Sequence, residues 1–115
     1  MNESKLQYEI IQWSQKEGYF CFHCPNGEKR DKRTANKLMA MGVKAGVPDL
    51  IFILPNGVTV WVELKSKKGK LSKVQEKFKE KILDFHHHYL LIQSDCHLEA
   101  VNYLGQELSR ICHLQ

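Results

Sequence analysis

Apolar residues recur at helical spacing in three parts of the chain. Leu6, Ile10 and Trp13 form one stripe, which predicts a helix over residues 3–17 that ends at Gly18. A second helix is predicted from Ser72 onward, and a third near the C-terminus. Their apolar stripes are Val74, Phe78 and Ile82 for the second helix, and Leu98, Val101, Leu104 and Leu108 for the third.

Four apolar segments between these helices have the length and residue types of β-strands. They are residues 19–24, 49–54, 58–65 and 89–93, and the first is expected to be a buried strand. The order of the elements predicts an α/β domain in which a central mixed β-sheet is flanked by α-helices. Residues 65–89 then form a right-handed crossover between parallel strands.

The stretch between the first two strands is polar and basic. A turn is predicted at Pro25-Asn26-Gly27, and residues 28–45 form the segment of the chain most expected to be mobile, with a short helix around residues 34–41. Gly42 and Gly46 bound this segment before the next strand begins.

The loop between the second and third strands decides which residues face each other. A three-residue loop at 55–57 is favoured by the proline at its first position, and it places Leu54 opposite Val58. Counting back along both strands then brings Asp49 directly opposite Glu63. The alternative is a two-residue turn at Asn56-Gly57, which shifts the register by one and sends the two carboxylates to opposite faces of the sheet.

Asp49 and Glu63 interrupt two otherwise apolar strands. A carboxylate in such a strand is costly unless a partner neutralises it, and two facing carboxylates repel each other. A hard divalent cation with oxygen ligands removes this repulsion and supplies a Lewis acid. Lys65 lies two residues beyond Glu63, so its side chain projects to the same face. The pattern is typical of a catalytic site.

Length and composition bound the class of protein. The chain has 115 residues, of which 43% are hydrophobic and 26% are charged, and this predicts a single globular domain over residues 1–115. No run of about 18 apolar residues occurs, and the polar N-terminus lacks the apolar segment of a signal peptide. We therefore expect a soluble, intracellular, cytoplasmic protein.

The positive charge is concentrated beside the candidate site. The formal net charge is +4, yet residues 65–81 alone contain eight lysines and two glutamates and so carry +6. Residues 28–33 add a second basic cluster of mixed sign. A lysine run is most often a solvated helix face, but one that adjoins paired carboxylates is suited to the phosphate backbone of a nucleic acid.

The cysteines and histidines give a weaker indication of chemistry. Cys21 and Cys24 have the spacing of half a zinc site, with Cys96, His97, Cys112 and His113 as possible partners, but no second pair at this spacing occurs. Without a secretory signal, the cysteines are expected to be reduced thiols. The three histidines at 86–88 fall at a predicted helix end, where we interpret them as structural or as facing nucleic acid.

The chain resembles the PD-(D/E)xK nuclease superfamily in a combination of motifs. The combination is Pro48-Asp49, an intervening strand pair, Glu63-Leu64-Lys65 and the downstream Gln75. Within it, the chain is most similar to the VRR-NUC family, which combines Gly-x-Pro-Asp-Leu, Glu-x-Lys and a later Gln with an N-terminal helix that bears an acid. The likeness covers roughly residues 3–93. It implies a restriction-endonuclease-like core.

The resemblance also implies a set of site residues. Asp49 and Glu63 would ligate Mg²⁺ or Mn²⁺ together with the backbone carbonyl of Leu64, and Lys65 would orient or activate the attacking water. Gln75 would lie near the metal or a phosphate, although Ser72-x-x-Gln75 is also a capping box that explains it structurally. The helix acid would be Glu3, with Glu9 as the competitor.

The leading hypothesis is a Mg²⁺- or Mn²⁺-dependent deoxyribonuclease. By its resemblance to small phage-encoded or bacterial stand-alone members, which are similar in fold to Holliday-junction resolvases, it would act as a homodimer on branched or flapped DNA, as in DNA repair. The residues expected to contact DNA are Lys67, Lys68, Lys70, Lys73, Arg30 and Arg33. The alternatives are a non-catalytic nucleic-acid-binding module that uses the lysine-rich face, and a zinc-stabilised interaction domain.

Overall fold

The structure of the chain is a computed structural model that describes residues 2–25 and 31–113. Within these residues, helices and strands follow one another in an α/β order. The elements are α1 (Glu3–Lys16), β1 (Phe20–His23), α2 (Lys32–Ala40), β2 (Leu50–Ile53), β3 (Thr59–Lys65), α3 (Lys73–Asp84), β4 (His88–Gln93) and α4 (His97–Cys112). Every element predicted from the sequence is present, with ends shifted by a few residues.

The four strands form one mixed sheet in the order β1-β2-β3-β4. Strands β1, β2 and β3 are antiparallel, whereas β3 and β4 are parallel and are joined through α3. In the hairpin, Leu50 faces Val62 and Ile53 faces Thr59, and the amide of Leu54 donates to the carbonyl of Val58 at 2.8 Å. The three-residue loop is therefore confirmed, and the two-residue turn is wrong.

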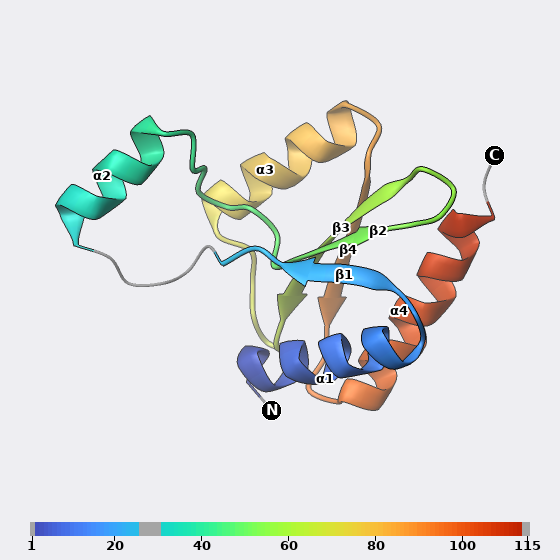
Figure 1. Cartoon of the computed structure of the whole chain (residues 1–115). Coiled ribbons are helices and arrows are strands. Elements are labelled where there is room, and N and C mark those ends of the chain that lie inside the picture. The colour runs from blue at the N-terminus through green and yellow to red at the C-terminus, as the bar shows by residue number, and fades with distance from the viewer. Residues whose placement is uncertain (1, 26–30, 114–115) are drawn as a thin grey trace.

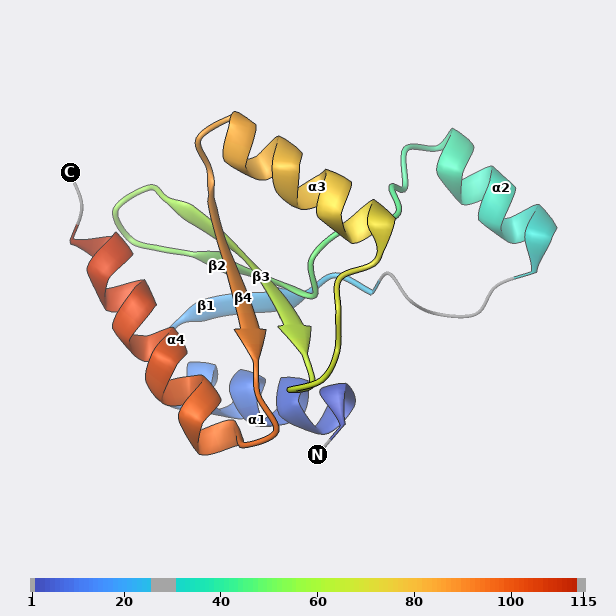
Figure 2. The same ribbon diagram turned by 180° about the vertical axis from the view of Figure 1, so that it is seen from behind.

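Helices cover both faces of the sheet, as Figures 1 and 2 show: α1 and α4 lie on one face and α3 on the other. The main core lies under α1 and α4. It contains Leu6 and Ile10 of α1, alternate residues of the strands such as Phe52 and Val62, and Leu104 of α4, all at most 1% exposed. The predicted fold class, a mixed sheet flanked by helices, is confirmed.

The prediction that the first strand is buried is wrong. Phe20 is 66% exposed and Phe22 is 41% exposed. The reason is that β1 is an edge strand and that, on this face of the sheet, α3 packs over β4 at the opposite edge. Two residues of the predicted helical stripes are also exposed, Val74 at 46% and Leu98 at 66%, because each lies in the first turn of its helix.

Helix α2 stands apart from the sheet and from the other helices in both views (Figures 1 and 2). Asp31 caps it by accepting a hydrogen bond from the amide of Thr34 at 2.7 Å, and none of its residues is buried. The short helix predicted in the polar stretch is thus confirmed. Asn26 and Gly27 of the predicted turn, and residues 28–30 of the basic cluster, lie outside the described residues.

The three consecutive histidines lie where the sequence places them, at the end of α3. His86 has a positive φ of 64°, its amide donates to the carbonyl of Leu83, and the amide of His87 donates to the carbonyl of Ile82. This pair of bonds is the Schellman arrangement that closes a helix C-terminus. None of the described helices is long and apolar enough to cross a membrane.

Candidate active site

Asp49 is held at the start of β2 by contacts with both neighbouring strands. Its backbone carbonyl accepts a hydrogen bond from the amide of Cys24 at 2.8 Å and lies 2.8 Å from Nδ1 of His23. Its carboxylate Oδ2 accepts a hydrogen bond from the amide of Leu64 at 2.7 Å. Regular pairing between β2 and β3 begins only at Leu50. The amide of Leu64 therefore bonds to the side chain of Asp49 and not to the backbone of a paired strand residue.

Glu63 is buried beside Asp49. Its side chain is 2% exposed, and Oε1 has no hydrogen-bond partner within the described part of the chain. Burial raises the pKa of Glu63 to about 9, assisted by a hydrogen bond with Asp49 and by the charge of that carboxylate. This shift favours the protonated form of Glu63, which can donate to Asp49, so the metal-free fold favours a single proton shared by the two acids.

This arrangement fits a bound divalent cation. A proton between two carboxylates occupies the place that a cation takes between two ionised ones, and the unpartnered Oε1 of Glu63 supplies a free lone pair. No group of three or more His, Cys, Asp and Glu side chains is placed to hold a metal among residues 2–25 and 31–113. Two carboxylates completed by carbonyl, water and phosphate oxygens are the donor set that Mg²⁺ commonly uses.

Lys65 and Glu3 adjoin the two carboxylates. Lys65 follows Glu63 on the same face of β3, and its Nζ lies 4.0 Å from Oε1 of Glu3, at the N-terminus of α1. The Lys65 side chain is 15% exposed, and that of Glu3 is 51% exposed. Glu9, the competing helix acid, instead pairs with Lys5 at 3.6 Å. Of the two candidates, the structure thus brings Glu3 to Lys65.

Gln75 forms the capping box that its spacing predicts. Its Oε1 accepts a hydrogen bond from the amide of Ser72 at 2.8 Å, and Oγ of Ser72 accepts one from the amide of Gln75 at 3.3 Å. The described hydrogen bonds of this side chain are therefore those of a helix cap. The backbone of Gln75 nevertheless lies close to the loop before Asp49, because a Cβ built on Gly46 would be 3.0 Å from its nitrogen.

The predicted DNA-contacting residues fall on two separate elements. The four lysines are exposed on the connection from β3 to α3 and at the first residue of α3; they are Lys67, Lys68, Lys70 and Lys73. The connection is held by Asp95, which accepts from the amide of Lys67 at 2.9 Å, and by Gln93, which donates to the carbonyl of Gly69. Arg33 lies on α2, away from the sheet, and Arg30 lies outside the described residues.

The cysteines do not gather into a metal site in the described residues. All four are free thiols. Burial raises the pKa of Cys21 to about 12, although a hydrogen bond with Ser14 opposes the shift, and burial also raises the pKa of Cys24. Since zinc binds the thiolate, this environment disfavours the half-site that the Cys21-x-x-Cys24 spacing indicates.

Sequence analysis did not identify Tyr89. Its hydroxyl is buried without a hydrogen-bond partner in the described residues, and Nζ of Lys79 lies 5.5 Å from the centre of its ring. The parallel register pairs Tyr89 with Trp61, so it shares the face of Glu63, and burial followed by the charge of Glu63 raises its pKa. Like Asp49 and Glu63, Tyr89 places a polar group in an otherwise apolar strand. This pattern could have identified Tyr89 from the sequence.

Comparison with known proteins identifies a family and two solved structures with a similar fold. Residues 1–95 match the VRR-NUC domain. A solved structure described as a VRR_NUC domain protein superposes with a TM-score of 0.75 at 21% identity, covering 93% of this chain and 87% of that one. A second, described as a VRR_NUC domain, gives a TM-score of 0.62 at 19% identity, covering 90% of this chain and 94% of that one. A search of curated proteins gave no match.

The fold and the family match define the class of protein. A mixed sheet that brings Asp49, directly before β2, beside Glu63 on β3 is the arrangement expected of a nuclease domain, and two solved structures share the fold. The match over residues 1–95 covers most of the chain. The chain belongs to the VRR-NUC family, a family of nuclease domains.

The proton between Asp49 and Glu63 predicts a pH dependence of stability in metal-free protein. Folding raises the pKa of Glu63 from 4.5 to about 9, so between these values the folded form holds a proton that the unfolded form has released. The free energy of unfolding must then fall as pH rises, by at most about 1.4 kcal/mol per pH unit. Urea unfolding in EDTA at pH 6, 7 and 8 measures this slope.

Glu63→Gln is the matched variant for this measurement. Glutamine keeps the size of the side chain and removes the titration, so the stability of this variant should change less steeply between pH 6 and pH 8 than that of the wild type. Other titrating groups affect both proteins equally. Parallel slopes would show that Glu63 is ionised in the folded protein.

Proposed function

We propose that this protein is a metal-dependent nuclease that hydrolyses DNA phosphodiester bonds, with residues 1–115 acting as one domain. The observation that carries the proposal is the buried Glu63 beside the half-buried Asp49, with Lys65 on the same face of β3. A pair of this kind is costly to the fold unless it serves a ligand of opposite charge. Membership of the VRR-NUC family supports nuclease chemistry in particular.

The carboxylates of Asp49 and Glu63, with the backbone carbonyl of Leu64, would hold Mg²⁺ or Mn²⁺. When bound, such a cation polarises the phosphoryl oxygens and lowers the pKa of water. Glu63 must lose its proton before it can act as a ligand, so the affinity for the cation should rise with pH. Asp49 is already oriented, because the amide of Leu64 fixes its Oδ2.

Lys65 and Glu3 would serve the reacting groups. In hydrolysis, the oxygen of a water molecule attacks phosphorus and loses a proton to solvent, the phosphorus–oxygen bond to one sugar breaks, and the departing sugar oxygen takes a proton from solvent to become a hydroxyl. The ammonium group of Lys65 would orient this water and counter the negative charge that develops on phosphorus. Glu3, 4.0 Å away, would hold the ammonium group in position, and Gln75 would present its side-chain amide to a phosphate.

The exposed lysines are suited to the DNA backbone. Lys67, Lys68, Lys70 and Lys73 follow Lys65 directly and would contact phosphates, as would Arg30 and Arg33. Phosphate contacts position a substrate and carry no sequence information, so we propose recognition of DNA structure, such as a branch, a four-way junction or a flap. A homodimer would present two such sites to the two arms of a branched substrate, and this would suit a role in DNA repair.

A panel of DNA substrates tests this function. Purified protein is incubated with single-stranded, duplex, flap and four-way-junction DNA of matched length, in Mg²⁺, Mn²⁺ or EDTA. We expect cleavage of a branched substrate with either cation and none in EDTA. Salt-sensitive binding to every substrate without any product, in either metal, would instead identify a binding module that uses the lysine-rich face.

A further inference from the structure

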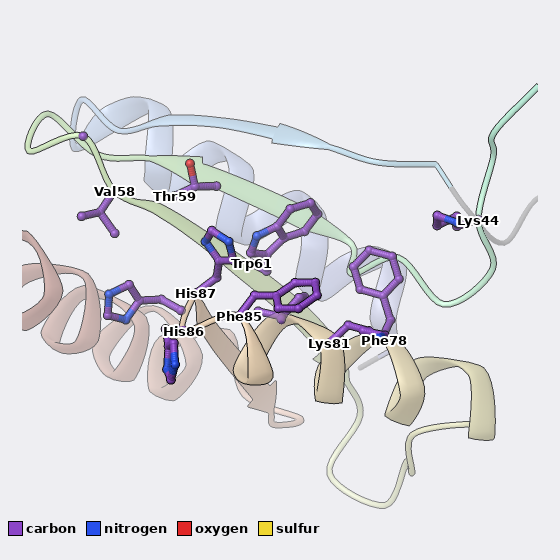
Figure 3. A pocket seen from close by; sticks show the side chains of 12 residues that line it. Lys44, Val58, Thr59, Trp61, Phe78, Lys81, Phe85, His86 and His87 are labelled. Atoms are coloured by element: carbon purple, nitrogen blue, oxygen red, sulfur yellow. The ribbon is translucent and has the colours of Figure 1, made fainter.

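A groove lies between α3 and β3, on the face of the sheet that carries Glu63 (Figure 3). Its volume is about 740 Å³. A second hollow of about 450 Å³ shares Lys44, Trp61 and Phe78 with it and extends toward the end of β1. The two hollows therefore adjoin each other at Lys44, Trp61 and Phe78.

Three aromatic side chains are presented in this groove. The rings of Trp61 and Phe78 lie 5.7 Å apart at an angle of 56°, and Phe85 at the end of α3 is 65% exposed. Figure 3 shows the three rings grouped in the middle of the groove, with Lys44 at one end and His86 and His87 toward the other. Phe85 is exposed, whereas Trp61 and Phe78 are half-buried, and aromatic side chains that line a groove are platforms on which nucleobases stack.

The charge along the groove has one sign. Besides the aromatic rings, its lining includes Lys44, Lys81 and the three histidines 86–88, and Nζ of Lys81 lies 5.4 Å from the centre of the Phe85 ring. Among the described residues that line the two hollows, none is Asp or Glu. Such a surface is complementary to a polyanion that also carries flat apolar groups, which is the chemistry of an unpaired nucleic-acid strand.

We propose that this groove binds an unpaired segment of the nucleic-acid substrate, with bases against Trp61, Phe78 and Phe85 and phosphates near Lys44 and Lys81. The inference rests on the proposed nuclease function and narrows its substrate to DNA with a single-stranded part. Trp61 and Glu63 project from the same face of β3 two residues apart, which is about 7 Å along a strand. A strand bound at Trp61 would thus lie two residues of β3 from Glu63, although neither carboxylate lines the groove itself.

A comparison of two strands tests the stacking without changing the protein. Fluorescein-labelled oligothymidylate and an abasic strand of the same length and charge are titrated with the protein in EDTA, and binding is followed by fluorescence anisotropy. Because stacking on an aromatic side chain commonly changes affinity by about tenfold per base, we expect the strand with bases to bind at least about tenfold more tightly. Equal affinities would overturn the proposal.

Phe85→Ala is the matching variant, and Leu98→Ala is its control. Phe85 and Leu98 are exposed to the same degree, 65% and 66%, but Leu98 lies on α4 and does not line the groove. We expect Phe85→Ala to weaken oligothymidylate binding by about tenfold, Phe85→Trp to preserve it, and Leu98→Ala to change it less than twofold. Lys81→Ala should weaken binding as well, with Lys16→Ala on α1 as the control for charge.

Two other outcomes would contradict the proposal. Equal binding by Phe85→Ala and Leu98→Ala would show that the groove does not contact the strand. A change in mass by light scattering in Phe85→Ala, with strand binding intact, would identify the groove as a contact between protein molecules.

The groove proposal and the proposed nuclease function can be disproved independently of each other. If wild-type protein cleaves no DNA but binds oligothymidylate in a manner that depends on Phe85, the groove stands and the catalytic assignment falls. If it cleaves junctions while strand binding is indifferent to Phe85 and to the presence of bases, the nuclease stands and the groove proposal falls.

Discussion

Asp49→Asn and Glu63→Gln are each expected to lower the rate of metal-dependent DNA cleavage by at least about 1000-fold. Each change removes one of the two carboxylates that would hold the cation, and the cation is expected to stabilise the transition state by several kcal/mol. The measurement is single-turnover cleavage of a branched DNA in Mg²⁺. Titration calorimetry with Mn²⁺ should show a matching loss of metal affinity.

The loss should occur without unfolding. Burial favours the protonated form of Glu63 in metal-free protein, and the amide of glutamine can donate the same hydrogen bond, so Glu63→Gln should unfold at no lower urea concentration than the wild type at pH 8. Glu9→Gln is the control, because Glu9 pairs with Lys5 on the surface of α1 and should leave cleavage unchanged within about twofold. Undiminished cleavage by either site variant would exclude the assignment.

The hairpin and its carboxylates were predictable because local chemistry determines them. Pro55 favours the longer loop, the loop sets the register of β2 against β3, and the register places Asp49 beside Glu63. Each step involves residues close together in the sequence. The same holds for the capping box of Ser72 and Gln75, which needs only a spacing of three residues.

Features that depend on distant parts of the chain were not predictable. The register of β4 against β3 is parallel and is set by packing across α3, so counting along the sequence cannot place Tyr89 beside Trp61. The exposure of Phe20 and Phe22 depends on β1 being an edge strand that α3 leaves uncovered, which the apolar pattern alone does not reveal. The aromatic groove arises in the same way, from α3 crossing the sheet at Trp61.

Gly46 lies in the loop before Asp49 and packs against the first turn of α3, which carries Gln75. Gly46→Ala is the second change for which we expect a large effect. Gly46 has a positive φ of 84°, and a Cβ added there would lie 2.3 Å from the carbonyl oxygen of Val74 on α3. The positive φ costs an alanine about 1–2 kcal/mol, and the overlap with backbone adds about 1–3 kcal/mol more. We therefore expect urea unfolding to show a loss of roughly 2–5 kcal/mol.

Gly57→Ala separates these two causes. Gly57 has nearly the same φ, 82°, but a Cβ added there meets no atom within 4 Å, so this variant should lose only the conformational part. The difference between the two variants then measures how tightly the loop before Asp49 packs on the first turn of α3. The overlap at Gly46 is with the backbone of Val74 and Gln75, and Gly46 lies three residues before Asp49. We therefore expect Gly46→Ala also to lower cleavage at temperatures where it remains folded, whereas Gly57→Ala should not. Equal losses of stability in the two variants would show that α3 moves away without cost, and that the loop does not position the site.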